Sequence, residues 1–108
     1  MTQVKTVEYI NSKINTGEAV LIYFSAKNCS VCSVLKPKIE KEVAKNFPKI
    51  QMYEVKADLY KQVASHFTVF SIPTILVFFD KKEFKRQGRN LSVSLFIKEL
   101  ERPYNLFI

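Results

Sequence analysis

The residues most able to do chemistry in this chain are its two cysteines, Cys29 and Cys32, which form a CxxC pair. A disulfide closing so short a loop adds little chain-entropy stabilisation. A chain that is 47% hydrophobic can bury a core without such a staple. We therefore interpret the pair as redox-active or metal-binding, the usual roles of CxxC in a reducing compartment.

The segments on either side of the cysteines must position them. The apolar run from Val20 to Phe24 shows no alternation and predicts a strand covered on both faces. After the pair, apolar residues recur every three or four positions and predict a helix to about Asn46: Cys32, Leu35, Ile39, Val43 and Phe47. Pro37 falls inside this helix, where proline removes a hydrogen bond and bends the axis.

The remaining elements alternate between helix and strand. A helix capped by Thr6 precedes the first strand, and residues 50–55 predict a second strand. Asp58 is expected to cap a helix with Leu59 on its apolar side. Residues 75–79 predict a strong strand, and residues 83–87 predict a polar edge strand that follows it after a hairpin turn. A last helix is expected to begin after Ser92, which can cap it. Pro103 is expected to end that helix, leaving the apolar tail to fold back or to serve as a docking strand.

This order predicts one α/β domain over residues 1–108, with a mostly parallel sheet of about four strands flanked by helices and completed by an antiparallel hairpin. We expect a cytoplasmic protein that crosses no membrane, because neither a signal peptide nor a spanning run is present. The net charge of +7 suits a solubilising surface or steering of acidic partners, and the dispersed basic residues do not indicate nucleic acid.

The whole pattern resembles the thioredoxin family. The resemblance rests on a strand followed by CxxC opening a helix, Pro37 five residues later, and Ile72-Pro73-Thr74 before a strand, with Gly88 beyond it. It implies a thioredoxin fold, a cis Ile72–Pro73 bond facing the cysteines, and a substrate-binding surface that includes Ile72, Pro73 and Asn28. It further implies a redox-active Cys29–Cys32 disulfide.

The expected activity is reduction of protein disulfides. Cys29, at the start of the helix, is the predicted nucleophile, because helix N–H groups stabilise a thiolate there. Cys32, one turn later on the apolar stripe, is the predicted resolving thiol. Electrons would come from a reductase like thioredoxin reductase, so no bound cofactor is implied, and we expect a monomer.

The sequence departs from the family at the site itself. Ser30-Val31 stand where Gly-Pro is usual, and Asn28 and Ser25 replace common tryptophans, which predicts a less hydrophobic rim. Tyr23 occupies the position of a buried aspartate that relays protons to the resolving thiol. Our hypothesis is that Glu54, with a raised pKa and oriented by the Tyr23 hydroxyl, serves as the proton acceptor instead. In the alternative, Glu54 lies on the surface and Tyr23 only fills the core.

Three other functions remain open at this stage. The same two sulfurs at a higher potential would make an oxidase or isomerase. A domain that kept the fold and lost turnover would be an interaction module. Two CxxC pairs across a dimer would bind a metal or an iron–sulfur cluster. The single histidine, His66, is expected at a solvated helix end and supplies too few additional ligands for a metal site within one chain.

Overall fold

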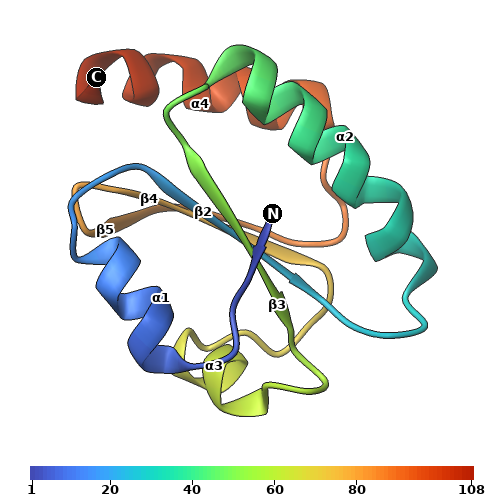
Figure 1. Cartoon of the computed structure of the whole chain (residues 1–108). Coiled ribbons are helices and arrows are strands. Elements are labelled where there is room, and N and C mark those ends of the chain that lie inside the picture. The colour runs from blue at the N-terminus through green and yellow to red at the C-terminus, as the bar shows by residue number, and fades with distance from the viewer.

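The computed structural model describes residues 1–108, in which a five-stranded sheet lies between two pairs of helices (Figure 1). The predicted α/β class, with a mixed sheet flanked by helices, is confirmed, but the sheet has one strand more than expected. No helix is both long and apolar enough to cross a bilayer. The elements follow in the order β1 (Thr2–Gln3), α1 (Val7–Ile14), β2 (Val20–Ser25), α2 (Ser30–Asn46), β3 (Gln51–Lys56), α3 (Lys61–His66), β4 (Thr74–Phe79), β5 (Lys82–Gln87) and α4 (Val93–Phe107).

The strands lie in the order β1-β3-β2-β4-β5, which places β2 at the centre of the sheet. Every residue of β2 is buried, as its unbroken apolar run predicted. β2 runs parallel to β3 but antiparallel to β4, and β5 returns antiparallel beside β4. The expectation of a mostly parallel sheet is therefore wrong, because β4 enters the sheet in the opposite direction to β2.

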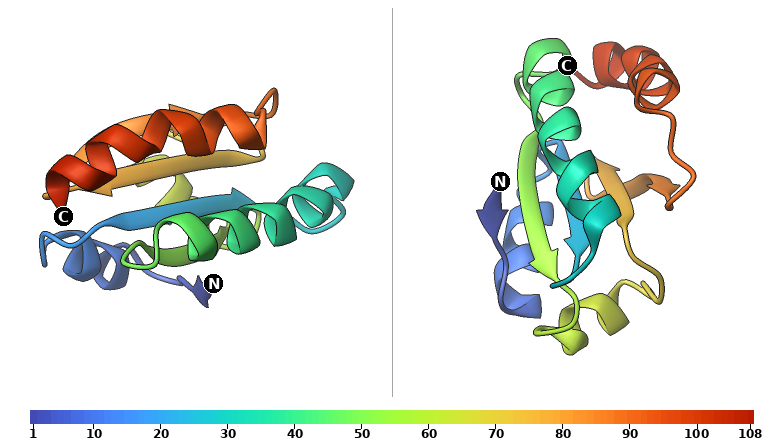
Figure 2. Two further views of the ribbon diagram at one scale, coloured as in Figure 1. Left: turned by 90° about the horizontal axis from the view of Figure 1, so that it is seen from above. Right: turned by 90° about the vertical axis from the view of Figure 1, so that its right-hand side faces the viewer.

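The two faces of the sheet carry separate core clusters. Leu21 and Tyr23 point to the face covered by α2 and α4, whereas Ile22 and Phe24 point to the face covered by α1 and α3 (Figure 2). This division follows from the alternation of side chains along a strand. The helix that begins at the cysteines is thereby held flat against the sheet by its buried stripe, which includes Leu35 and Ile39.

Local sequence signals account for several element ends. The hydroxyls of Thr6 and Ser92 accept hydrogen bonds from the backbone N–H groups of Tyr9 and Leu95, so both predicted N-caps are confirmed. The predicted hairpin turn joins β4 to β5 through Asp80 and Lys81, whose φ angles are 51° and 70°. Two positive φ angles are what a tight two-residue hairpin needs, and this turn reaches them without glycine.

The expected Asp58 cap is wrong. The chain after β3 first makes a turn in which the N–H groups of Leu59 and Tyr60 both donate to the carbonyl of Lys56. This turn delays α3 until Lys61, leaves Leu59 68% exposed, and gives the helix no side-chain cap. Asp58 instead accepts a 3.3 Å hydrogen bond from the N–H of Lys27, in the loop that leads to the cysteines.

The expected end of the last helix at Pro103 is also wrong, because α4 continues to Phe107 with this proline inside it. Proline removes one backbone hydrogen bond from the helix, and the burial of the side chain that follows it offsets this loss. Tyr104 packs on Phe47 with ring centroids 4.8 Å apart, and its hydroxyl accepts a hydrogen bond from the N–H of Lys49. The tail therefore packs onto the body as a helix rather than extending as a strand.

Candidate active site

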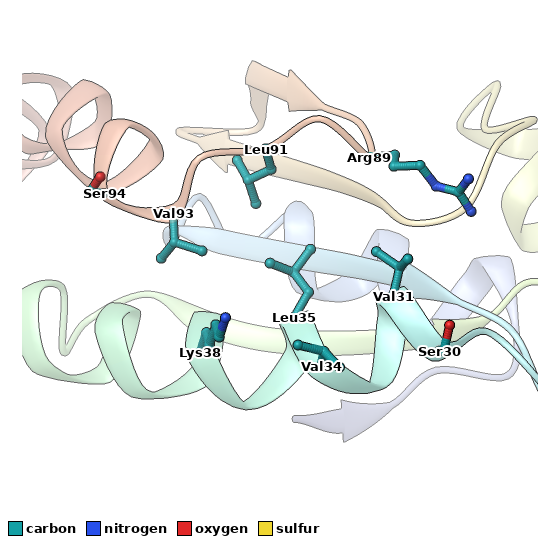
Figure 3. A pocket seen from close by; sticks show the side chains of 9 residues that line it. All are labelled: Ser30, Val31, Val34, Leu35, Lys38, Arg89, Leu91, Val93 and Ser94. Carbon is teal, nitrogen blue, oxygen red and sulfur yellow. The ribbon is translucent and has the colours of Figure 1, made fainter.

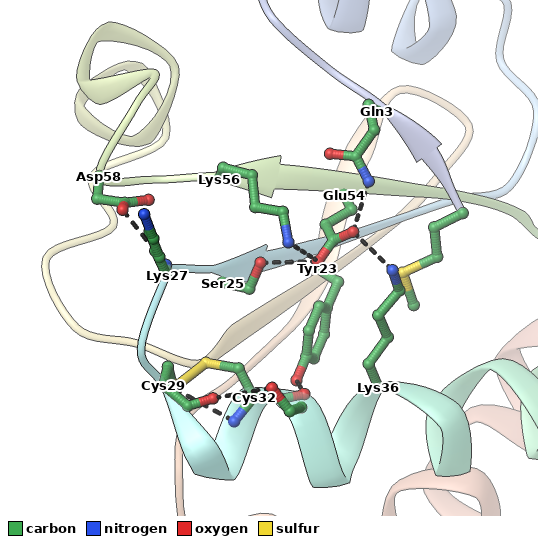
Figure 4. Close-up of polar contacts among 12 residues, drawn as sticks. Gln3, Tyr23, Ser25, Lys27, Cys29, Cys32, Lys36, Glu54, Lys56 and Asp58 are labelled. Carbon is green, nitrogen blue, oxygen red and sulfur yellow. Dashed lines mark hydrogen bonds and ion pairs between the residues drawn. A yellow bond between two sulfur atoms is a disulfide. The ribbon is translucent and has the colours of Figure 1, made fainter.

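The two cysteines lie where the central strand passes into α2. After β2 ends at Ser25, a short loop brings Asn28 into the left-handed region, with φ of 62°, which asparagine adopts more readily than most residues. Cys29 is the N-cap of α2, and it forms a disulfide with Cys32 one turn later (Figure 4). The predicted position of Cys29 at the start of the helix is confirmed.

The environments of the two sulfurs differ. Cys29 is partly exposed, whereas Cys32 is only 3% exposed and belongs to the core cluster under α2. The Sγ of Cys29 accepts a 3.2 Å hydrogen bond from the backbone N–H of Cys32. This donor, together with the positive end of the α2 dipole, favours negative charge on the Cys29 sulfur when the pair is reduced. The geometry thus suits an accessible nucleophile and a buried second thiol.

The loop before β4 has the backbone expected from its sequence. The Ile72–Pro73 peptide bond is cis, which confirms what the family resemblance implied. The Thr74 hydroxyl donates a 2.7 Å hydrogen bond to the carbonyl of Ser71 and closes the loop. Pro73 is buried and Ile72 half-buried, and both Ile72 and Cys29 pack against the core cluster under α2. Asn28 is exposed on the loop before the cysteines.

Tyr23 connects the sheet to the first turn of α2. Its side chain is fully buried, and its hydroxyl donates a 2.7 Å hydrogen bond to the backbone carbonyl of Cys32. Burial, with a smaller contribution from the charge of Glu54, raises the pKa of Tyr23 to about 12. Tyr23 therefore holds the backbone of the second cysteine in place as a neutral group.

A buried carboxylate lies on the neighbouring strand, where Glu54 is paired in register with Tyr23. Glu54 is 1% exposed, and every partner of its side chain is a donor (Figure 4). Oε1 accepts from Lys36 at 2.8 Å and from Gln3, and Oε2 accepts from Ser25 at 2.7 Å and from Lys56 at 3.3 Å. We call this group of five residues the Glu54 cluster.

The charge state of Glu54 follows from these partners. Burial alone raises the pKa of Glu54, but hydrogen bonds from Lys36, Gln3 and Ser25, together with the positive charge of Lys36, outweigh it. The net result is a pKa lowered to about 2. Glu54 is thus ionised at neutral pH, with its charge balanced inside the fold, and it ties β1, β2 and α2 to β3.

Comparison with known proteins agrees with this geometry. The thioredoxin family model matches residues 1–101. The thioredoxin-like protein YdfQ of Bacillus subtilis is 32% identical over 99% of this chain and 95% of its own length. The chain belongs to the thioredoxin family. A thioredoxin of Chlamydia trachomatis is 36% identical over 80% of the chain and 82% of its own length.

Solved thioredoxins show the same fold at lower identity. The crystal structure of the Trypanosoma brucei brucei thioredoxin has a TM-score of 0.83 at 20% identity, with 97% of this chain and 91% of that chain covered. The Fasciola hepatica thioredoxin has a TM-score of 0.78 at 24% identity, with both chains fully covered. The predicted thioredoxin fold is confirmed. Family, fold and the Cys29–Cys32 pair together support thiol–disulfide oxidoreductase activity.

Two parts of the hypothesis for Glu54 are wrong for this thioredoxin-family chain. The Tyr23 hydroxyl does not orient Glu54, because it bonds to the carbonyl of Cys32. The pKa of Glu54 is lowered rather than raised, because the cluster supplies cations and donors. The alternative of a surface glutamate is also wrong, since Glu54 is buried. Proton transfer by Glu54 stays a prediction, and a carboxylate with this pKa is a weak base at neutral pH.

The partners of Glu54 were missed by sequence reasoning. Ser25 was assigned to the rim, yet it is 2% exposed and bonds to Glu54. Lys36 lies off the apolar stripe of α2 and Gln3 precedes the first predicted element, so neither residue carries a signal in the sequence. One signal was available: Lys56 lies two residues after Glu54 on one strand, so both side chains share a face.

The remaining titratable candidate lies apart from this site. His66 is the last residue of α3, is exposed as predicted, and packs edge-on against Phe67 at 4.8 Å between ring centroids. The structure contains no group of three or more His, Cys, Asp or Glu side chains placed to hold a metal ion.

Proposed function

We propose that this protein reduces disulfide bonds in other proteins through Cys29 and Cys32. The observation that supports these roles most is the contrast between the two sulfurs: Cys29 is partly exposed at the N-cap with a donor at 3.2 Å, and Cys32 is buried beside it. An exposed, stabilised thiolate can attack a partner, and a buried thiol within disulfide distance can release that partner.

The reaction balances as two exchanges. The Cys29 thiolate attacks one sulfur of the substrate disulfide, forms a mixed disulfide, and releases the other substrate sulfur as a thiolate. Cys32, after losing its proton, attacks the Sγ of Cys29, which forms the Cys29–Cys32 disulfide and releases the second substrate thiolate. Two electrons have then passed to the substrate. A reductase like thioredoxin reductase returns them, so the domain needs no bound cofactor of its own.

Substrate placement is assigned to the surface around the two sulfurs. Ile72 and Pro73 precede β4, and Asn28 is exposed on the loop before Cys29. We propose that an extended segment of the partner lies along this loop while its sulfur reaches Cys29. The absence of tryptophan leaves this rim with less apolar area, which favours a narrow choice of partner.

Trapping of the mixed disulfide tests the assigned roles. Cys32→Ser should accumulate a covalent complex with a disulfide-bonded protein such as insulin, because nothing resolves it. Cys29→Ser, which also leaves one thiol, is the matched control and should trap almost none. Equal trapping by both variants would overturn the assignment of nucleophile and resolving thiol.

The reduction potential tests the direction of electron flow. Equilibration with glutathione buffers, followed by mass, gives the potential of the Cys29–Cys32 pair. A value near the roughly −270 mV of reducing thioredoxins supports a reductase. A value above about −180 mV would favour the oxidase or isomerase instead. A pair that never cycles would indicate an interaction module. The cytoplasmic location and the monomeric state stay predictions.

A further inference from the structure

A groove runs along α2 from the active site to the start of α4 (Figure 3). Its volume is about 600 Å³, which is in the range of small-ligand sites. The groove shares no residue with the hollow beside Ile72, which belongs to the substrate loop already described. Its walls are formed by Ser30, Val31, Val34, Leu35, Lys38, Arg89, Leu91, Val93 and Ser94.

One end of the groove lies beside the two cysteines. Ser30 and Val31 are the two residues between the cysteines, and they form one end of it. A partner joined to Cys29 through a mixed disulfide therefore has its neighbouring residues within reach of this surface. Val31 is 38% exposed and Val34 is 59% exposed, so apolar area remains for a partner to cover.

The charges of the groove have one sign. Lys38 and Arg89 are its only charged residues, no carboxylate lines it, and neither cation takes part in an ion pair in the structure. Figure 3 shows Val31 and Leu35 between the two cations. An apolar floor with an unpaired cation toward each end fits a segment that combines aliphatic and acidic side chains. The net charge of +7 attracts the same kind of partner.

We propose that this groove binds the part of a substrate protein next to its reactive cysteine, and that this part carries an aliphatic residue flanked by Asp or Glu. This inference rests on the proposed reductase function and adds its substrate class. A second copy of the chain is a poorer occupant, because a symmetric dimer through this groove would bring Lys38 and Arg89 of both copies together.

Competition between matched disulfides tests the proposal. Three oxidised substrates are compared with the reduced protein: a peptide with Leu and Glu on both sides of its cysteine, the same peptide with Lys for Glu, and 2-hydroxyethyl disulfide. The second-order rate constant should be about tenfold higher for the acidic peptide than for the basic one, since two exposed ion pairs contribute up to about fivefold each. Division by the rate with 2-hydroxyethyl disulfide removes differences in intrinsic thiol reactivity.

Reversing the charges of Lys38 and Arg89 tests whether these two residues cause the preference for the acidic peptide. In the double variant Lys38→Glu with Arg89→Glu, the ratio of acidic to basic peptide rates should fall at least tenfold and invert. The milder pair Lys38→Gln with Arg89→Gln should abolish the preference without inverting it, and it retains the test if the reversed variant folds poorly. Lys45→Glu is the matched control, because Lys45 is an exposed lysine of α2 outside the groove. It should leave the ratio unchanged.

The outcomes separate the two proposals. If 2-hydroxyethyl disulfide and both peptides are reduced at similar rates, the groove assignment fails and the reductase function stands. If no disulfide is reduced, the reductase function fails and the groove assignment fails with it. If sedimentation shows a dimer that Val34→Asp, a charge placed on the exposed apolar floor of the groove, dissociates, the groove is an interface between copies and the proposal is overturned.

Discussion

Replacing Glu54 by glutamine tests whether a buried anion stabilises this fold. The variant keeps the shape of the side chain but removes its charge. It also places an amide among donors from Lys36, Lys56 and Ser25, where the wild-type carboxylate accepts on both oxygens. The two ammonium groups then lose the only carboxylate with which each is paired.

The magnitude follows from the pKa of Glu54. A pKa lowered from 4.5 to about 2 means that the folded state favours the ionised form by about 3 kcal/mol more than the unfolded chain does. This figure uses roughly 1.4 kcal/mol for each pH unit. Breaking a buried pair by removing one partner costs about the same. We therefore expect Glu54→Gln to lower the free energy of unfolding by about 3 kcal/mol at pH 7.

The stability that the ionised Glu54 contributes depends on pH. A carboxylate whose folded pKa is depressed contributes its full stability above the unfolded value of 4.5, and this contribution is lost as the pH falls toward about 2. The difference between wild type and Glu54→Gln should be constant from pH 7 to about pH 5. It should then shrink steadily in acid, because the wild type alone loses the ionised Glu54.

Urea unfolding at a series of pH values, with the disulfide intact in both proteins, measures this difference. Glu101→Gln is the matched control, because Glu101 is exposed and makes no ion pair. It should change stability by less than about 0.5 kcal/mol at any pH. A gap below about 0.5 kcal/mol for Glu54→Gln at pH 7, or a gap that does not narrow in acid, would refute this reasoning.

Four further substitutions test other parts of the structure by urea unfolding. Lys36→Met should cost more stability than Lys56→Met, because Lys36 approaches Glu54 at 2.8 Å against 3.3 Å; the reverse order would contradict the assignment. Ile39→Ala should cost about 2–5 kcal/mol, since this side chain is fully buried under α2, and a loss below about 1 kcal/mol would be inconsistent with that packing. Tyr104→Phe should cost about 1 kcal/mol through its bond to Lys49, and no loss would show that the tail is not held there.

The sequence was a good guide to several elements that could be read by themselves. The apolar stripe from Cys32 to Phe47 predicted α2 because a helix buried on one face repeats every three to four residues. Ser92 predicted the start of α4 because its hydroxyl satisfies a donor of the first turn. The order of these elements, with Ile72-Pro73-Thr74, was sufficient to place the cysteines at the end of the central strand.

Features that depend on a distant partner were not predictable in the same way. β1 is two residues of exposed polar sequence, and it is a strand only because it pairs with β3. α4 passes through Pro103 because Tyr104 packs against Phe47, which lies at the end of the neighbouring helix α2. The Glu54 cluster joins residues from β1, β2, α2 and β3, so no local pattern contains it.

The same distant contacts determine how the buried thiol can lose its proton. Tyr23 bonds to the carbonyl of Cys32, and Glu54 is its partner in register on the next strand. The pKa of Tyr23 is raised to about 12 and that of Glu54 is lowered to about 2. Neither changes charge between about pH 5 and pH 9. The resolving step, in which Cys32 attacks the mixed disulfide, should therefore follow one ionisation, that of Cys32 itself.

Stopped-flow measurement of that step from pH 5 to pH 9 should give a single inflection. Tyr23→Phe removes the bond to the Cys32 carbonyl and should lower stability by about 1 kcal/mol, but it should leave the inflection in place. Glu54→Gln should leave it in place as well. A second inflection that disappears in Glu54→Gln would show instead that Glu54 accepts the proton. The pKa of Glu54 would then have to be higher in the mixed disulfide than in the oxidised protein.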